Sequence, residues 1–346
     1  MRVFVAGATG AIGQHLVPSL VADGHEVIGT TRSPSKASQL ENAGATPAVV
    51  DGLDRRAVLD AVQAAQPDVI VHQMTALASM RNFRNFDKEF AITNELRTKG
   101  TDYLLEAARQ AGARRFIAQS FIGWNNARTG SQVKTETDPL DPDPLPATRQ
   151  SMAAIRHVEE TVPGAVPEGL VLRYGMFYGP DASDSMLDVV RKRQMPVIGG
   201  GVGTWSFTEV TDAAAATAAA VTRGAPGIYN IVDDDPAPVR EWLPYLSECL
   251  GVKPPMRAPG WLGKLLAGEV VVSLMTEARG SSNAKARREL GWAPRYPSWR
   301  DGFPVWVDGL KTAQLKTAPL KTAQLKTAQL TTAQLKTAQA AHERAA

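Results

Sequence analysis

Short apolar runs rich in β-branched residues alternate with alanine- and leucine-rich segments along most of the chain. Runs of about four to eight such residues are typical of buried strands, and the longer segments between them have the apolar spacing of helices. Strands that alternate with helices predict a parallel sheet covered on both faces. The predicted strands are residues 2–6, 25–29, 46–50, 68–72, 115–119, 169–175 and 228–232.

The alternation weakens after residue 175, and prolines, glycines and tryptophans cluster between residues 236 and 300. We therefore predict an α/β fold, with a Rossmann-type doubly wound parallel sheet and a smaller C-terminal substrate-binding cap. The tryptophans fit either the core of this cap or the wall of a pocket. The sheet domain is expected at residues 1–175, with 205–235 returning to it, and the cap at 176–204 and 236–308.

Residues 309–346 form a low-complexity tail in which a five-residue unit, LKTAQ, recurs with few deviations. On a helix, each five-residue step rotates the leucine by about 140°, so the leucines form no stripe. Such a segment has no apolar face to bury. We expect a disordered tail or a fraying helix, and an interaction arm is the alternative.

The formal net charge of +3 comes from this tail, whose lysines outnumber its acidic residues, and the rest of the chain is slightly acidic. Its basic residues are not interleaved with aromatic ones, which argues against nucleic-acid binding. The single cysteine, Cys249, and five scattered histidines predict neither a disulfide nor a metal site. Without a signal peptide or an apolar run of about 18 residues, we expect a cytoplasmic protein that spans no membrane.

The stretch VFVAGATGAIGQHL places Gly7, Gly10 and Gly13 between the first predicted strand and the first predicted helix. Glycines there permit a tight turn and a close approach of backbone N–H groups to a pyrophosphate, which the helix N-terminus attracts. Because a strand precedes the glycines and an α/β series follows them, they predict a dinucleotide-binding site.

The second predicted strand leads into Thr30, Thr31 and Arg32, where a site for NAD usually carries an acidic residue that binds the ribose hydroxyls. A site for NADP omits that carboxylate and supplies a cation. We therefore expect NADP(H) to be preferred, with NAD(H) still possible. The alternative is that Arg32 only stacks on the adenine.

Several further stretches carry a resemblance to a known family: VVDGLD, TNELRTKGTDYLLEAAR, FIAQSF, LRYGMFYGP, FTEVTDAAAA and SNAKARRELGWAPRYPSWRDGF. With the glycine loop, they make residues 1 to about 303 similar to an extended short-chain dehydrogenase/reductase of the NAD-dependent epimerase/dehydratase type. The resemblance implies that Asp51 reaches the adenine. The predicted cofactor-binding residues are Gly7, Thr9, Gly10, Ala11, Ile12, Gly13, Thr31, Arg32, Asp51, Gly52, Met74 and Arg156.

The resemblance also implies hydride transfer at C4 of a nicotinamide, with a tyrosine that exchanges the proton and a lysine four residues later. When the helical stretch RQSMAAIRHVEE is aligned on Glu160, Met152 and Arg156 stand at these two positions. None of the six tyrosines has a lysine four residues later. Arg156 can hold the ribose, but a group with a pKa above about 12 is no base. The family's acid is therefore missing.

Two residues near strand ends are the candidate substitutes. Ser120, near the end of the fifth predicted strand, could polarise a substrate carbonyl, and Tyr174 or a water could deliver the proton. Each also fits a structural role, Ser120 as a partner of the backbone and Tyr174 as a buried core residue. The predicted catalytic residues are Ser120, Tyr174 and Arg156.

The leading hypothesis is an NADP-dependent oxidoreductase or an epimerase/dehydratase-type enzyme that acts on a small carbonyl or hydroxyl compound. A cofactor-binding sensor without catalysis and a non-redox enzyme on the same fold are the alternatives. Members of the resembled family often form homodimers through a four-helix interface. Residues 89–111 and the helix that begins near residue 149 would supply it here.

Overall fold

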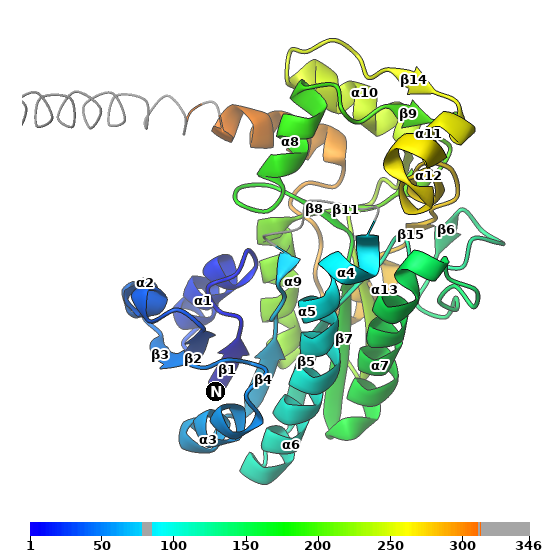
Figure 1. The fold of residues 1–346 in the computed structure, drawn as a ribbon. Helices are drawn as coiled ribbons and strands as arrows, with labels where there is room; N and C mark the ends of the chain where they lie inside the picture. Colours follow the sequence, from blue (N-terminus) through cyan, green and yellow to red (C-terminus); the bar gives the residue numbers. More distant parts are fainter. Residues whose placement is uncertain (78–84, 311, 313–346) are drawn as a thin grey trace, which may run out of the picture. The chain divides into compact units, whose positions relative to one another are not determined.

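A computed structural model of the chain describes residues 1–77, 85–310 and 312. It divides into two compact units, residues 1–303 and 304–346, and the first contains all the elements named below. Its centre is a sheet of seven parallel strands in the order β12-β7-β5-β4-β1-β2-β3 (Figure 1). The seven predicted strands are confirmed as β1 (Arg2–Ala6), β2 (Glu26–Thr31), β3 (Thr46–Val49), β4 (Val69–His72), β5 (Arg115–Phe121), β7 (Glu168–Tyr174) and β12 (Gly227–Ile231).

Helices cover both faces of this sheet. Val3 and Val5 of β1 belong to a buried cluster with α1 and α9, whereas Phe4 and Ala6 belong to a second cluster with α3, α6 and α7. Because both faces are buried, the central strands are mostly apolar, and the predicted doubly wound sheet is confirmed. The helices around the sheet are α1 (Gly13–Ala22), α2 (Ala37–Asn42), α3 (Arg55–Ala65), α6 (Thr101–Ala111), α7 (Arg149–Ala165) and α9 (Val210–Thr222).

Short elements connect β4 to α6 and β5 to α7. The first connection includes a π-helical segment, η4 (Leu96–Gly100), which leads directly into α6. π-Helical turns inside helices are rare and often occur at functional sites. The first connection also contains α4 (Phe86–Glu89) and α5 (Ala91–Glu95), and the second contains β6 (Val133–Lys134) and η5 (Pro146–Thr148). One further short element, η1 (Pro34–Lys36), lies between β2 and α2.

The cap lies over the C-terminal ends of the sheet strands (Figure 1). Trp242 and Trp299 are buried inside it against Phe207, so these tryptophans belong to its core. Its elements are β8 (Met176–Tyr178), α8 (Asp184–Arg191), β9 (Val197–Ile198), β10 (Thr204–Trp205), β11 (Phe207–Glu209), β13 (Ala237–Pro238), α10 (Val239–Cys249), β14 (Arg257–Ala258), α11 (Gly260–Ala267), α12 (Glu269–Thr276) and β15 (Gly280–Ser281).

Two elements differ from the predicted boundaries. The sequence assigned residues 205–235 to the sheet domain, but β11 within this range pairs with β8 of the cap. The sequence assigned residues 236–308 to the cap, but Ala286 and Leu290 of α13 (Ala284–Leu290) are buried in the same cluster as α1 and α9. This helix therefore packs on the sheet domain. The predicted LKTAQ tail lies outside the described residues except for residues 309, 310 and 312.

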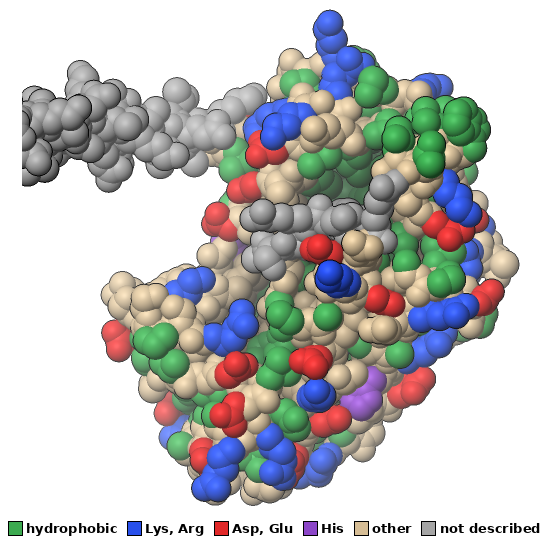
Figure 2. Space-filling view, viewed as in Figure 1, with side chains coloured by type: hydrophobic (Ala, Val, Ile, Leu, Met, Phe, Trp, Pro, Cys, Tyr) green, Lys and Arg blue, Asp and Glu red, His purple; other side chains and the backbone are tan. Residues whose placement is uncertain are grey.

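Acidic and basic side chains are interspersed on the face of the molecule in Figure 2. The cap helix α11 differs, because it exposes Trp261, Leu265 and Leu266, each more than half accessible to solvent. Within the described ranges, no helix is long and apolar enough to cross a bilayer.

Candidate functional site

The turn between β1 and α1 holds all six of the predicted loop residues, from Gly7 to Gly13. Gly7 has φ +91°, and a Cβ on it would lie 2.8 Å from the main-chain carbon of Gln73. A Cβ on Gly13 would lie 2.4 Å from the carbonyl oxygen of Ala8. Both positions therefore require glycine, and the turn stays tight enough to present the N-terminus of α1 to an anion.

The end of β2 lies directly beside this turn. The Gly7 N–H donates to Thr30 Oγ1 at 3.0 Å, and the Thr9 hydroxyl donates to Thr31 Oγ1 at 3.3 Å. Arg32 follows as an exposed side chain that has no hydrogen-bond or ion-pair partner among the described residues. An exposed guanidinium beside a glycine loop suits a phosphate group.

A small, mostly apolar depression lies between β1, β2 and the start of α3. A Cβ on Gly52 would lie 2.3 Å from the sulfur of Met74, so the glycine leaves room for that side chain in the wall of this depression. Asp51 is exposed and stands in the chain between the lining residues Val50 and Gly52, and its Oδ1 accepts the Leu53 N–H at 3.0 Å. An apolar slot beside an exposed carboxylate, close to the glycine loop, suits the adenosine end of a dinucleotide.

Ser120 belongs to a buried network that the sequence did not predict. Its hydroxyl donates to Glu159 Oε1 at 2.8 Å, and Arg173 donates to the same carboxylate at 2.8 Å and 2.6 Å. Ser120 and Arg173 are register partners on β5 and β7, so their side chains emerge on the same face. The hydroxyl hydrogen of Ser120 is therefore used in the bond to Glu159. The lone pairs of the Ser120 oxygen can still accept a hydrogen bond from another donor.

The buried glutamate is Glu159, whereas Glu160, the residue used to align the helix, is exposed. If Glu159 is the reference instead, Ser151 and Ile155 take the positions of the family's tyrosine and lysine. Neither alignment supplies an acid. Glu159 could have been recognised from the helix spacing, because it continues the apolar series Met152, Ile155 and Val162.

Tyr174 lies on the opposite face of the sheet from Ser120, so the structure does not bring these two candidates together. Its hydroxyl lies 2.7 Å from Thr217 Oγ1 and accepts from Gln73 Nε2 at 2.9 Å. Burial raises the pKa of Tyr174 to about 12, which makes the phenol a weaker acid. This environment fits the structural role that the sequence left open.

Replacing Tyr174 with phenylalanine should lower the free energy of unfolding by about 1–2 kcal/mol, because two buried hydrogen bonds are lost. Turnover should change little. Denaturant unfolding and steady-state rates check both expectations, with Tyr103→Phe on α6 as the matched variant. A folded Tyr174→Phe protein with turnover reduced about 100-fold or more would identify Tyr174 as the proton donor after all.

Arg156 is half-buried on α7, and its Nη2 donates to the main-chain oxygen of Asp141. His157, the next residue, bonds to Asp102 of α6 at 2.7 Å. Since neighbouring residues on a helix point about 100° apart, Arg156 lies on a different side of α7 from α6. Its role in holding the nicotinamide ribose stays a prediction.

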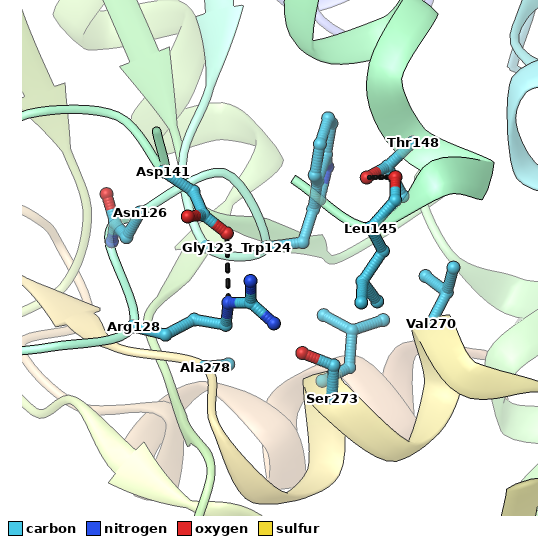
Figure 3. A pocket seen from close by; sticks show the side chains of 11 residues that line it. Gly123, Trp124, Asn126, Arg128, Asp141, Leu145, Thr148, Val270, Ser273 and Ala278 are labelled. Atoms are coloured by element: carbon cyan, nitrogen blue, oxygen red, sulfur yellow. Dashed lines mark hydrogen bonds and ion pairs between the residues drawn. The ribbon is translucent and has the colours of Figure 1, made fainter. Parts of the chain in front are cut away.

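A hollow opens beyond the end of β5, between the sheet domain and α12 of the cap (Figure 3). Arg128 is held there by Asp141, with Nε 2.9 Å from Oδ2, and it donates to the main-chain oxygen of Asp143. The hollow lies at the C-terminal edge of the parallel sheet, which is where such folds bind ligands. The lining residues are Gly123, Trp124, Asn126, Arg128, Asp141, Leu145, Thr148, Val270, Ser273, Leu274 and Ala278.

A sequence model of the NAD-dependent epimerase/dehydratase family matches residues 3–232, which contain the glycine loop and all seven strands of the sheet. The chain belongs to this family. The family assignment confirms the resemblance and the fold class that the sequence predicted. Within the described residues, no three histidine, cysteine, aspartate or glutamate side chains gather as a metal site.

The curated relatives include proteins that are named reductases. The chain is 44% identical over 306 residues to a 3-diazoavenalumate denitrifying reductase from a Streptomyces species, covering 86% of this chain and 98% of the relative. It is 30% identical over 322 residues to a 4-hydroxy-2-methyl-3-oxo-4-farnesyl-3,4-dihydroquinoline-1-oxide ketoreductase from Stigmatella aurantiaca, covering 85% and 92%. The chain is therefore an NAD(P)-dependent enzyme of the oxidoreductase or epimerase type.

Among solved structures, the UDP-glucose 4-epimerase of Thermus thermophilus in complex with NAD superposes with a TM-score of 0.68 at 25% identity. The alignment covers 89% of this chain and 98% of the epimerase. The glycine-lined turn and the apolar slot beside it suit a nicotinamide dinucleotide, in agreement with this family.

Proposed function

We propose that this enzyme is an NADPH-dependent reductase that removes dinitrogen from a small aromatic diazo compound. One observation carries the proposal: α7 has Met152 and Arg156 where the resemblance expects the family's tyrosine and lysine, and neither alignment of this helix supplies an acid. The 44% identity to a denitrifying reductase supports the same substrate class.

The chemistry explains why such a substrate needs no acid. When bound, the reduced nicotinamide supplies a hydride. A carbonyl that accepts hydride becomes an alkoxide and requires a proton from a positioned group. An aryl diazonium is already cationic, so hydride addition to its terminal nitrogen gives a neutral diazene. The diazene then releases N₂ while its N–H hydrogen passes to carbon, and the products are the arene, N₂ and NADP⁺.

The chain's own residues would bind and orient the two reactants. The β1–α1 turn would hold the pyrophosphate, and Arg32 would bind the 2′-phosphate of NADPH. Arg156 would hold the nicotinamide ribose, and Ser120 would orient the polar group of the substrate. In the hollow, Trp124 and the leucines beside it offer an apolar wall for a flat ring.

The test is stoichiometric. The purified chain is incubated with NADPH and 4-hydroxybenzenediazonium, and NADPH consumption and N₂ release are measured against a blank without enzyme. We expect one N₂ per NADPH, with the phenol as product. Consumption of NADPH without N₂ release, or no consumption above the blank with either this substrate or 4-carboxybenzenediazonium, would exclude this activity.

A small ketone or quinone is the second candidate substrate, as the sequence first suggested, because the ketoreductase relative is named for carbonyl reduction. In that case water or Ser120 would have to supply the proton. A panel of ketones and quinones in the same assay distinguishes the two candidates, since carbonyl reduction consumes NADPH without releasing gas.

We also propose a homodimer formed through α6, α7 and the elements before α6. His157 and Asp102 already join α6 to α7 within one chain, and Ile92 of α5 exposes half of its side-chain surface on this side. Light scattering coupled to size-exclusion chromatography gives the mass directly. A monomer at all concentrations would contradict the proposal.

A further inference from the structure

Arg97 is a buried cation whose charge is not fully compensated within the chain. It belongs to the π-helical segment η4, and only 3% of its surface is exposed. Its Nε and Nη1 atoms are buried and have no hydrogen-bond partner in the part of the chain that the structure describes. Burying an unpaired guanidinium is strongly unfavourable, so such an arrangement needs a reason.

The charged groups around Arg97 do not balance it. Glu159 acts on it electrostatically, but that carboxylate already accepts two hydrogen bonds from Arg173 and one from Ser120. Burial is the main cause that lowers the pKa of Arg97, to about 10, so it remains charged at neutral pH. Burial likewise lowers the pKa of His72 to about 4, so His72 is neutral. Two guanidiniums therefore share one carboxylate.

The position of this excess charge is specific. His72 ends β4, and Ser120 lies near the end of the neighbouring β5. Arg97 interacts electrostatically with His72 and with Glu159, the partner of Ser120, so it lies near the sheet edge that binds ligands. On its other side, the guanidinium carbon is 6.0 Å from the ring centroid of Phe90. Phe90 stacks on Phe86, which contacts Trp124 in the wall of the hollow. A series of aromatic contacts therefore connects Arg97 to the wall of the hollow.

We propose that Arg97 binds an anionic oxygen of the substrate, a phenolate or a carboxylate oxygen, and thereby selects substrates that carry one. The inference rests on the proposed function and names its substrate class. The phosphates of the cofactor are expected at the β1–α1 turn and not at the ends of β4 and β5, so they are not the anion that Arg97 would bind. An anionic oxygen would pair with the unused N–H groups of Arg97.

The charge also orients the substrate. A fixed cation repels the diazonium end of an aryl diazonium, so this end points away from Arg97 while the anionic oxygen points toward it. A substrate with both groups is neutral overall and is accepted. A diazonium compound without an anionic oxygen is repelled by the same residue.

The test compares three substrates that differ only in the substituent para to the diazonium group: 4-hydroxybenzenediazonium, 4-carboxybenzenediazonium and unsubstituted benzenediazonium. In Arg97→Gln, kcat/KM should fall about 100-fold for whichever anionic substrate the site uses, because two charge-assisted hydrogen bonds are lost. It should stay equal or rise for unsubstituted benzenediazonium. The first two substrates distinguish a phenolate from a carboxylate.

Three comparisons keep the result interpretable. Arg109→Gln, an exposed arginine on α6, is the matched control and should change none of these rates. Arg97→Lys keeps the charge and should recover part of the activity. The affinity for NADPH should stay within about threefold in all variants. An equal loss for charged and uncharged substrates, or a selective loss of NADPH binding, would overturn the proposal.

Calorimetry separates this proposal from the proposed function. The NADP⁺-loaded enzyme is titrated with 4-hydroxybenzoate and with neutral 4-methylanisole. If no diazonium is reduced, the proposed function fails, yet binding of the anion that is lost in Arg97→Gln would still support the anion site. Absence of anion binding in the unmodified enzyme would overturn it. If Arg97→Gln does not fold, Arg97→Lys is compared with the unmodified enzyme in the same titration, and unchanged anion binding would count against the proposal.

Discussion

Replacing Glu159 with glutamine should lower the free energy of unfolding by about 3–5 kcal/mol, the usual effect of breaking a buried ion pair from one side. Glutamine keeps the shape of the side chain and can still accept from Ser120. It removes the only carboxylate that faces the Arg173 guanidinium in the described network, and Arg173 is 3% exposed. Arg97 loses the same compensating charge.

Denaturant unfolding measures this effect, and Glu160→Gln is a close control. Glu160 lies next in the chain but is exposed, so its replacement should change stability by no more than about 0.5 kcal/mol. A double variant, Glu159→Leu with Arg173→Leu, should recover part of the loss, because Arg173 is no longer left as an unpaired charge, whereas Arg97 still loses the compensating charge of Glu159. Equal stability of the two glutamine variants would show that the network contributes nothing.

The sheet could be predicted because local patterns determine it. A parallel strand buried on both faces is mostly apolar, so VFVA in β1 and VIVH in β4 can be recognised without any knowledge of their neighbours. The glycine turn is equally local, since Gly7 and Gly13 are required by contacts near their own strand and helix. Such features need no information about distant parts of the chain.

The catalytic side of the site could not be predicted in the same way, because it depends on strand register and on contacts between distant segments. That Ser120 faces Arg173 follows from the pairing of β5 with β7, and this pairing leaves Tyr174 on the other face. The helical spacing around Arg97 also contains a signal, which the sequence analysis did not use. Arg97 falls on the buried stripe with Phe90, Thr101 and Leu104, where an arginine is unexpected.

Replacing Arg32 with glutamate should weaken NADPH binding about 100-fold and leave NADH binding unchanged or slightly stronger. Arg32 is exposed at the end of β2, beside the glycine turn, and the two preceding residues are Thr30 and Thr31, which carry no negative charge. The variant removes a cation from the 2′-phosphate and adds a like charge. The same carboxylate can accept hydrogen bonds from the ribose hydroxyls of NADH, as in sites that prefer NAD.

Calorimetric titration of the purified enzyme and its variants with NADPH and NADH measures this selectivity. Arg109→Glu carries the same charge change at the C-terminal end of α6, which precedes the start of β5 and so lies at the opposite edge of the sheet. It should bind both cofactors like the unmodified enzyme. If Arg32→Glu weakens NADPH and NADH equally, Arg32 stacks on the adenine common to both, and the preference for NADPH must come from another residue. If neither affinity changes, the 2′-phosphate lies beyond the reach of this side chain.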